Sequence, residues 1–166
     1  MDGQPPSEQS SGRLPALGPR GEGWFIGQLA FLVAIVVAPV DPWPASLASP
    51  ARWVGIVLIV SGLALAGRGI LDLGANLTPF PRPRRTGELV ERGVYAFLRH
   101  PIYAGLVLLA VGWSLARPSG LGALLSLALA LFLDLKARRE EEFLAATFPG
   151  YRAYRRRTSR FIPRVY

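Results

Sequence analysis

Residues 99–120 read RHPIYAGLVLLAVGWSLARPSG: a polar turn, an uncharged stretch from Ile102 to Ala116, and a second turn. Pro101 fixes its own φ and disfavours helix at His100, so a helix is expected to begin here. Gly105 lets another backbone approach closely. The first turn puts ionisable groups where water meets lipid. Such groups are costly to hold there, which makes them candidates for function. The alternative is an Arg-His pair that snorkels to anchor a helix end.

Composition and charge distribution predict an all-α integral membrane protein with about four transmembrane helices. Half of the residues are hydrophobic (51%), yet the formal net charge is +8, and the two properties are segregated along the chain. The apolar segments are Trp24 to Val40, Trp53 to about Gly74, Ile102 to Ala116, and Ser119 to Leu135. The last two are joined by a short turn and predict a tight hairpin. Both are shorter than the ~20 residues of a typical span, which local thinning of the bilayer would accommodate.

The second segment also carries two opposite charges. Arg68 and Asp72 are spaced (i, i+4), so they share a helix face and are expected to pair.

The arrangement of basic residues predicts the orientation. Basic residues concentrate between segments two and three and after segment four, whereas the other connections hold few charges. The first group is Arg82, Arg84, Arg85, Arg92 and Arg99; the second begins at Lys136 and continues to Arg164. The positive-inside rule then places both groups, and with four spans both termini, in the cytoplasm. A bacterial inner membrane is the expected location.

Several classes of site are excluded or disfavoured. The chain has no cysteine and one histidine, which excludes thiolate chemistry and disfavours a His-rich metal site, so no metal is expected. Residues 1–23 are rich in Gly, Pro and Ser and predict a disordered lead. A retained first anchor is favoured over a cleaved signal peptide. Because the arginines flank membrane segments, anionic lipid headgroups are expected partners and nucleic acid is not.

The region from Lys136 to Phe148 follows the last apolar segment without a break and predicts a helix that leaves the membrane. Lys136 with Glu140, and Arg138 with Glu142, are spaced (i, i+4), which is typical of a solvated salt-bridge ladder. An apolar stripe of Phe143, Leu144 and Phe148 is typical of packing. Pro149-Gly150 ends this helix. A helical, cytoplasmic tail follows, with Tyr151, Tyr154 and further arginines.

Residues 86–163 resemble the isoprenylcysteine carboxyl methyltransferase family and its bacterial relatives, which overlap with the phospholipid methyltransferases. Four blocks match in order. They are Gly87-Glu88-Leu89-Val90 with Gly93-Val94-Tyr95, then Arg99-His100-Pro101 with Tyr103 and Gly105, then Glu140-Glu141 with Phe148, and finally Tyr151 and Tyr154 followed by Ile162-Pro163. The sequence departs from the family in two places: Lys136 replaces a frequent arginine, and Arg117-Pro118 replaces a frequent Asn-Pro.

The resemblance implies an integral membrane enzyme that transfers a methyl group from S-adenosylmethionine. The cofactor would be bound by Leu89, Val90, Tyr95, His100, Pro101, Tyr103 and Glu140, with Glu140 receiving its α-ammonium group. Lys136 would contact the substrate. If the nucleophile is an amine, Glu141 or His100 would accept its proton. Aromatic faces suit a sulfonium cation, and a carboxylate suits an ammonium.

The expected domain organisation follows from this resemblance. Residues 24–75 form two N-terminal transmembrane helices, and residues 76–166 form the methyltransferase core of cofactor loop, hairpin and tail. The acceptor is expected to be lipid-borne or embedded in the membrane. O-methylation of a carboxylate is favoured, and N-methylation of a lipid amine is the alternative. A non-catalytic four-span protein and a membrane reductase of related architecture are the competing hypotheses.

Overall fold

A computed structural model describes residues 17–18, 21–78, 80 and 87–163. Over these residues the fold is helical, without a β-strand apart from one isolated bridge. The elements are α1 (Glu22–Val37), α2 (Ala45–Leu73), the 3₁₀ turns η1 (Gly74–Asn76) and η2 (Gly93–Ala96), α3 (Pro101–Ala116), α4 (Gly120–Thr147) and α5 (Tyr151–Arg157). The predicted all-α class is therefore confirmed for the described part of the chain.

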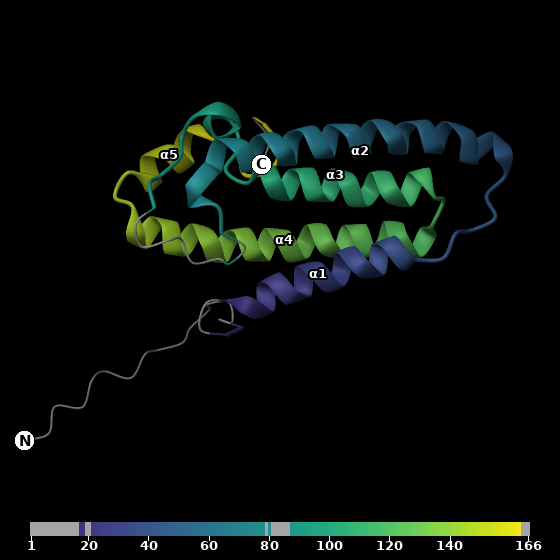
Figure 1. The fold of residues 1–166 in the computed structure, drawn as a ribbon, viewed down its shortest axis with the longest axis horizontal. Helices are drawn as coiled ribbons and strands as arrows, with labels where there is room; N and C mark the ends of the chain where they lie inside the picture. The colour runs from purple at the N-terminus through teal and green to yellow at the C-terminus, as the bar shows by residue number, and fades with distance from the viewer. Residues whose placement is uncertain (1–16, 19–20, 79, 81–86, 164–166) are drawn as a thin grey trace, which may run out of the picture.

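Four long helices lie roughly side by side, with α2 against α3 and α1 against α4 (Figure 1). Among the described helices, α2 and α4 are long and apolar enough to cross a membrane, and α1 and α3 are shorter apolar helices of 16 residues each. Large apolar side chains point outward along α1, α2 and α4, such as Val37, Trp53 and Leu131. This exposed apolar surface is what lipid contact requires, whereas a soluble protein would bury it.

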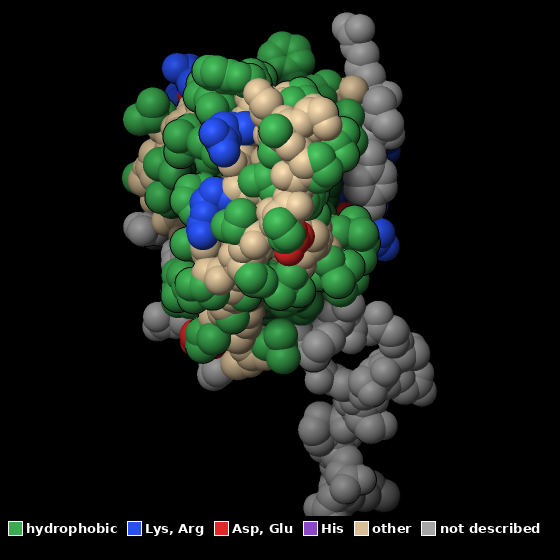
Figure 2. Space-filling model, turned by 90° about the vertical axis from the view of Figure 1, so that its right-hand side faces the viewer, with side chains coloured by type: hydrophobic (Ala, Val, Ile, Leu, Met, Phe, Trp, Pro, Cys, Tyr) green, Lys and Arg blue, Asp and Glu red, His purple; other side chains and the backbone are tan. Residues whose placement is uncertain are grey.

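Charge is unevenly distributed between the two ends of the bundle. The end farthest from α5 presents mainly hydrophobic side chains and few charged ones (Figure 2). There Asp41 accepts a hydrogen bond from the Gly120 amide, and Arg117 donates to the Val36 carbonyl at 2.9 Å. These contacts tie the α1–α2 connection to the tip of the α3–α4 hairpin. Ser119 caps α4 by accepting from the Gly122 amide at 3.0 Å.

Glycines bring α2 and α3 into close contact. Gly55, Gly62 and Gly69 recur every seven residues on α2, and they face α3, where Gly105 and Gly112 lie. A Cβ added to Gly62 would lie 2.7 Å from the Gly105 carbonyl oxygen, and a Cβ on Gly105 would meet the Gly62 carbonyl at the same distance. Small residues allow such contact between apolar helices in lipid. The predicted close approach at Gly105 is confirmed.

The connection after α2 is fixed by Asp72. Its carboxylate pairs with Arg68 at 2.9 Å, as predicted, and also accepts from the Val94 amide at 2.8 Å. Gly93 beside it has φ +60°, and an added Cβ would collide with the Asp72 carboxylate. A residue without a side chain is therefore required where the loop is held on the end of α2.

Residues 97–100 are joined to the chain's last described segment by backbone hydrogen bonds. The Arg99 amide donates to the Ser159 carbonyl at 2.8 Å, and the Ser159 amide donates to the Phe97 carbonyl at 3.0 Å. The His100 amide donates to the Arg160 carbonyl at 3.2 Å. We call this pairing of residues 97–100 with residues 159–160 the backbone seam. It holds the turn before α3 against the segment that follows α5.

Two predicted helix starts differ from the observed ones. Glu22 and Gly23, placed in the disordered lead by sequence, begin α1, where an acidic residue suits the first turn of a helix. Residues 1–16 and 19–20 of that lead lie outside the described residues. Helix α2 starts at Ala45 rather than Trp53 and includes Pro50 near its start. The apolar pattern does not reveal that α2 begins at Ala45, because Ser46, Ser49 and Pro50 interrupt the run of apolar residues.

Candidate functional site

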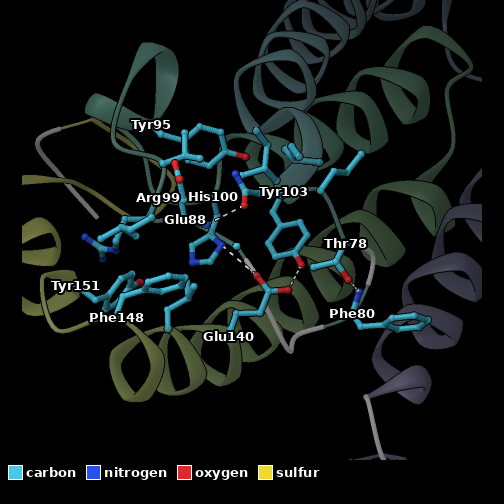
Figure 3. A pocket seen from close by; sticks show the side chains of 18 of the residues that line it. Thr78, Phe80, Glu88, Tyr95, Arg99, His100, Tyr103, Glu140, Phe148 and Tyr151 are labelled. Atoms are coloured by element: carbon cyan, nitrogen blue, oxygen red, sulfur yellow. Dashed lines mark hydrogen bonds and ion pairs between the residues drawn. The ribbon is translucent and has the colours of Figure 1, made fainter. Parts of the chain in front are cut away.

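The charged end of the bundle encloses a cavity of about 220 Å³ (Figure 3). Its wall comes from the ends of α1, α2 and α4, the start of α3, the loop over residues 87–90, and α5. Because those elements are far apart in sequence, the cavity exists only when the bundle and the loops have come together. Of the expected site residues, the cavity wall includes Leu89, Val90, Tyr95, His100, Tyr103, Lys136 and Glu140.

Glu140 projects from α4 towards α3. The Tyr103 hydroxyl donates a hydrogen bond to one Glu140 oxygen, and His100 Nδ1 lies 3.5 Å from the other. The rings of His100 and Tyr103 are stacked, with interplanar angle 2° and centroids 5.5 Å apart. One carboxylate is thus held by two aromatic side chains on the cavity wall (Figure 3).

Glu141 points to a different cluster. It accepts from Arg99 Nε at 2.9 Å and from two nitrogens of Arg160 at 3.1 Å, and His100 Nε2 lies 3.4 Å away. Its side chain is 3% exposed. Arg99 also donates to the Arg155 carbonyl at 3.0 Å and to Thr158. A carboxylate bound by two buried guanidiniums is stabilised in its charged form. That setting opposes the predicted role of Glu141 as proton acceptor.

Lys136 lies inside the protein, 1% exposed, rather than on a solvated ladder. Its Nζ donates to Gln28 Oε1 of α1 at 2.8 Å and sits 5.1 Å from the Tyr103 ring centroid. The ladder also pairs differently from the predicted register, since Arg138 donates to Asp134 and Arg139 donates to Glu142. An ammonium this deeply buried is costly unless its surroundings or a ligand stabilise it.

Burial and charge set the ionisation of the side chains in the loops around the cavity. Burial opposes the charged form of His100, but the hydrogen bonds and negative charges of Glu140 and Glu141 outweigh it and raise the pKa of His100. Burial raises the pKa of Tyr95, Tyr151 and Tyr154, so all three remain neutral phenols at physiological pH. The Tyr154 hydroxyl donates to the Tyr95 carbonyl at 2.8 Å.

One buried polar atom on the cavity wall, the Tyr151 hydroxyl, has no hydrogen-bond partner among the described residues, whereas His100 Nε2 faces Glu141 at 3.4 Å. Buried polar atoms are almost always paired, so unpaired ones on a cavity wall point to a missing ligand or water.

Pro101 is the expected cofactor residue that the structure does not bring to the cavity wall. It is fully buried at the first position of α3, and a Cβ on Gly69 of α2 would lie 3.2 Å from its ring. Pro101 therefore packs the helix pair and shapes the turn. The predicted arginines at 82, 84 and 85 lie outside the described residues.

Sequence reasoning missed part of the wall. The unpredicted residues include Phe25, Gln28, Asn76, Thr78, Leu144 and Phe148. Leu144 and Phe148 were interpreted as packing residues, but both line the cavity. A signal for Gln28 existed, because it is the single amide in the otherwise apolar run from Trp24 to Val37. Asn76 accepts from the Glu88 amide at 2.9 Å and so positions the loop.

Comparisons with known proteins identify a matching family model and several relatives. A family model described as "Phospholipid methyltransferase" matches residues 50–150. The "Cobalt-zinc-cadmium resistance protein CzcN" of Cupriavidus metallidurans is 31% identical over 138 residues, which is 82% of this chain and 61% of that protein. The "Nickel-cobalt-cadmium resistance protein NccN" of Alcaligenes xylosoxydans xylosoxydans is 39% identical over 83 residues, 49% of this chain and 39% of that protein.

A third relative has an enzyme name. The "Protein-S-isoprenylcysteine O-methyltransferase" of Schizosaccharomyces pombe is 34% identical over 108 residues, 63% of this chain and 46% of that protein. The chain thus spans between 39% and 61% of the length of these relatives.

Proposed function

Because this chain belongs to the phospholipid methyltransferase family, we propose that it is an integral membrane enzyme that transfers a methyl group from S-adenosylmethionine to a membrane-resident acceptor. The observation that carries the proposal is the single cavity shared by Glu140, His100, Tyr103, Tyr95 and Lys136. A fold of helices without the soluble methyltransferase sheet suits an acceptor that remains in the bilayer.

The residues present fit the cofactor. Glu140 offers a carboxylate on the cavity wall for an ammonium group, and Tyr95 and Tyr103 offer aromatic faces to a sulfonium cation. Leu89 and Val90 add apolar surface, and the Tyr151 hydroxyl is available for a polar contact. When bound, S-adenosylmethionine would supply an electrophilic methyl group.

Lys136 supports a carboxylate as the acceptor. Its buried ammonium, held by Gln28 and the Tyr103 face, would attract an acidic group and repel a protonated amine. A carboxylate nucleophile needs no general base, so the main task of the protein is alignment of the reacting atoms. N-methylation of a lipid amine is the second candidate, and it requires a proton acceptor. His100 is better placed for that role than Glu141, because two arginines hold Glu141 as a carboxylate.

The proposed topology has four spans, with the cavity and both ends of the described chain on the cytoplasmic side of a bacterial inner membrane. It is supported by the antiparallel course of α1 to α4 (Figure 1) and by the basic residues around the cavity. A cytoplasmic cavity would be accessible to a soluble cofactor, and the flanking apolar helices would present it to a lipid-borne substrate.

Cofactor binding tests this function directly. We expect S-adenosylhomocysteine to raise the melting temperature of the detergent-purified protein, with a stabilisation of about 2.7 kcal/mol at a hundredfold excess over its dissociation constant. NADPH should have no effect. A shift with NADPH alone would favour the membrane reductase, and no shift with either ligand in a folded sample would favour a non-catalytic protein.

A further inference from the structure

A second pocket is lined by Arg99 and Arg160, the two buried arginines that bind Glu141. Its volume is about 620 Å³, and it is formed by η2, the end of α5 and the segment after α5. Arg99 is the described residue that lines both hollows. The pocket is distinct from the proposed methyl-transfer site, and an anion could bind in it whether or not the protein transfers methyl groups.

The wall of this pocket is strongly basic. Five arginines line it, and none of its described lining residues is acidic; they are Arg99, Arg155, Arg156, Arg157 and Arg160. Three carboxylates pair with these arginines: Glu141 with Arg99, Arg155 and Arg160, Asp134 with Arg160, and Glu91 with Arg157. Five guanidiniums around one hollow exceed the acids that pair with them, so the pocket attracts an anion.

Two of the arginines are buried, and the other three are exposed. Arg99 and Arg160 are 9% exposed and fixed by Glu141, while Arg155 and Arg157 are 57% exposed. Arg156 is exposed and has no ion-pair partner among the described residues. Buried guanidiniums beside exposed ones suit a phosphate group, which accepts bidentate hydrogen bonds from guanidinium.

Apolar groups beside the pocket distinguish a lipid from a soluble phosphate. Phe97 lines the pocket and is 68% exposed, and Ile162, next to the lining residue Pro163, is 54% exposed. Large apolar side chains are costly to expose to water but are stable at the membrane interface. Both side chains lie beside the arginines. The positive charge at this end of the bundle predicts that it faces the headgroups of the cytoplasmic leaflet.

We propose that this pocket, which we call the arginine pocket, binds the phosphate of an anionic phospholipid headgroup, with Phe97 and Ile162 inserted beside the acyl chains. The bound lipid would lie against Arg99 and hence next to the proposed methyl-transfer cavity. This is a stoichiometric lipid site, in contrast to diffuse attraction between a basic surface and a charged membrane.

The test measures binding of phosphatidylglycerol to the full-length protein in zwitterionic detergent micelles, by native mass spectrometry and by thermal shift. Arg156→Gln should weaken binding about fivefold, the typical effect of one basic residue at an anionic surface. Arg152→Gln is the matched control, because it removes the same charge from the same helix at an exposed position outside the pocket. Arg156→Lys should lose less affinity than Arg156→Gln, because it keeps the charge but not the bidentate hydrogen bonds. Phe97→Ser should weaken lipid binding without a change of charge.

Soluble glycerol phosphate provides the second arm. We expect it to compete poorly with phosphatidylglycerol, because it lacks the acyl chains that Phe97 would contact. Equal competition at matched concentration would overturn the lipid assignment. Equal losses for Arg156→Gln and Arg152→Gln would overturn the pocket itself, because both variants lower the net charge equally. If these variants still bind S-adenosylhomocysteine, their loss of lipid binding is independent of the proposed methyl-transfer site.

Discussion

Glu140 and Glu141 are neighbours in sequence, but their carboxylates contact different sets of side chains, which among the described residues have only His100 in common. Glu140 meets Tyr103 and His100 on the cavity wall, whereas Glu141 is held by Arg99 and Arg160. His100 contacts both acids, with Nδ1 near Glu140 and Nε2 near Glu141. Substitutions at the two positions should therefore produce different defects.

Glu140→Gln should weaken S-adenosylhomocysteine binding at least about 30-fold, while lowering the melting temperature of the free protein less than Glu141→Gln does. It keeps the shape and the Tyr103 contact but removes the charge, and loss of one partner from a buried charge pair costs about 2–5 kcal/mol. Isothermal titration in detergent measures the effect. Glu142→Gln is the control, since that side chain is 48% exposed and its loss should cost under about 1 kcal/mol. Equal losses for the two variants would contradict the assignment of Glu140.

Glu141→Gln should destabilise the fold. Removing one partner of a buried ion pair costs about 3–5 kcal/mol because the opposite charges are left buried, and here two guanidiniums lose their carboxylate. Thermal unfolding monitored by circular dichroism checks this, again beside Glu142→Gln. Limited proteolysis should cut the variant near residues 155–160 first, because Glu141 holds that segment. A variant as stable as the wild type would show that the cluster contributes little.

Gly62→Ala should destabilise the α2–α3 pair by about 1–3 kcal/mol, the usual cost of overpacking. The added methyl would lie 2.7 Å from the Gly105 carbonyl oxygen and 2.9 Å from the Leu109 nitrogen. Gly67→Ala on the same helix is the matched control, because a Cβ there meets nothing within 4 Å. Alanine is the better helix former, so the control should be neutral or slightly stabilising. Melting temperatures of the two variants, measured in the same detergent, show whether the effect of alanine comes from helix–helix packing or from helix propensity.

The stability of the folded protein should fall as pH rises above about 6.5, the ordinary pKa of histidine. The pKa of His100 is raised in the folded state, so its proton is bound more tightly there than in the unfolded chain. This stabilisation is fully present below pH 6.5 and is lost as pH rises through the folded pKa. Melting temperatures from pH 5.5 to 8.5 measure it. The slope should be flatter in His100→Gln, and parallel curves for the two proteins would assign the slope to other groups.

Single cysteines should report the proposed topology, and the chain's lack of native cysteine leaves no background. A cysteine replacing Arg92 or Arg152 should react with a membrane-impermeant maleimide only from the cytoplasmic side. A cysteine replacing Ser46 should react only from outside. All three positions are exposed, so a failure to label would not arise from burial. Labelling of the cysteines at Arg92 and Arg152 from opposite sides of the membrane would contradict the proposed topology, because both segments must face one cavity.

The helical bundle was predictable because long apolar runs, bounded by charged residues, are typical of helices that contact lipid. Ile102 to Ala116 was predicted as a helix and is observed as Pro101–Ala116. The glycine contacts of α2 were not predicted, although Gly55, Gly62 and Gly69 are evenly spaced. A repeat of small residues marks a face for close packing but does not name the helix that packs on it.

Site residues could be predicted from the sequence only where they belong to one of the recognised motifs. The motifs identified His100, Tyr103 and Glu140, but not Gln28 or Arg160, which reach the same region from opposite ends of the chain. The register of the ladder also escaped prediction. The (i, i+4) rule gives several pairings for a dense run of charges, and burial of Lys136 decides among them.

The backbone seam has a consequence for the order of events during biosynthesis. The ribosome delivers α1 to α4 to the membrane before it delivers residues 159 and 160, which complete the seam with residues 97–100. Until then Glu141 lacks Arg160, and the segment that follows α5 is not yet held against the turn before α3. The helices can therefore insert while the cavity is still open, and closure follows translation of residue 160. Insertion into lipid and assembly of the site are separate steps, performed in that order by a single chain.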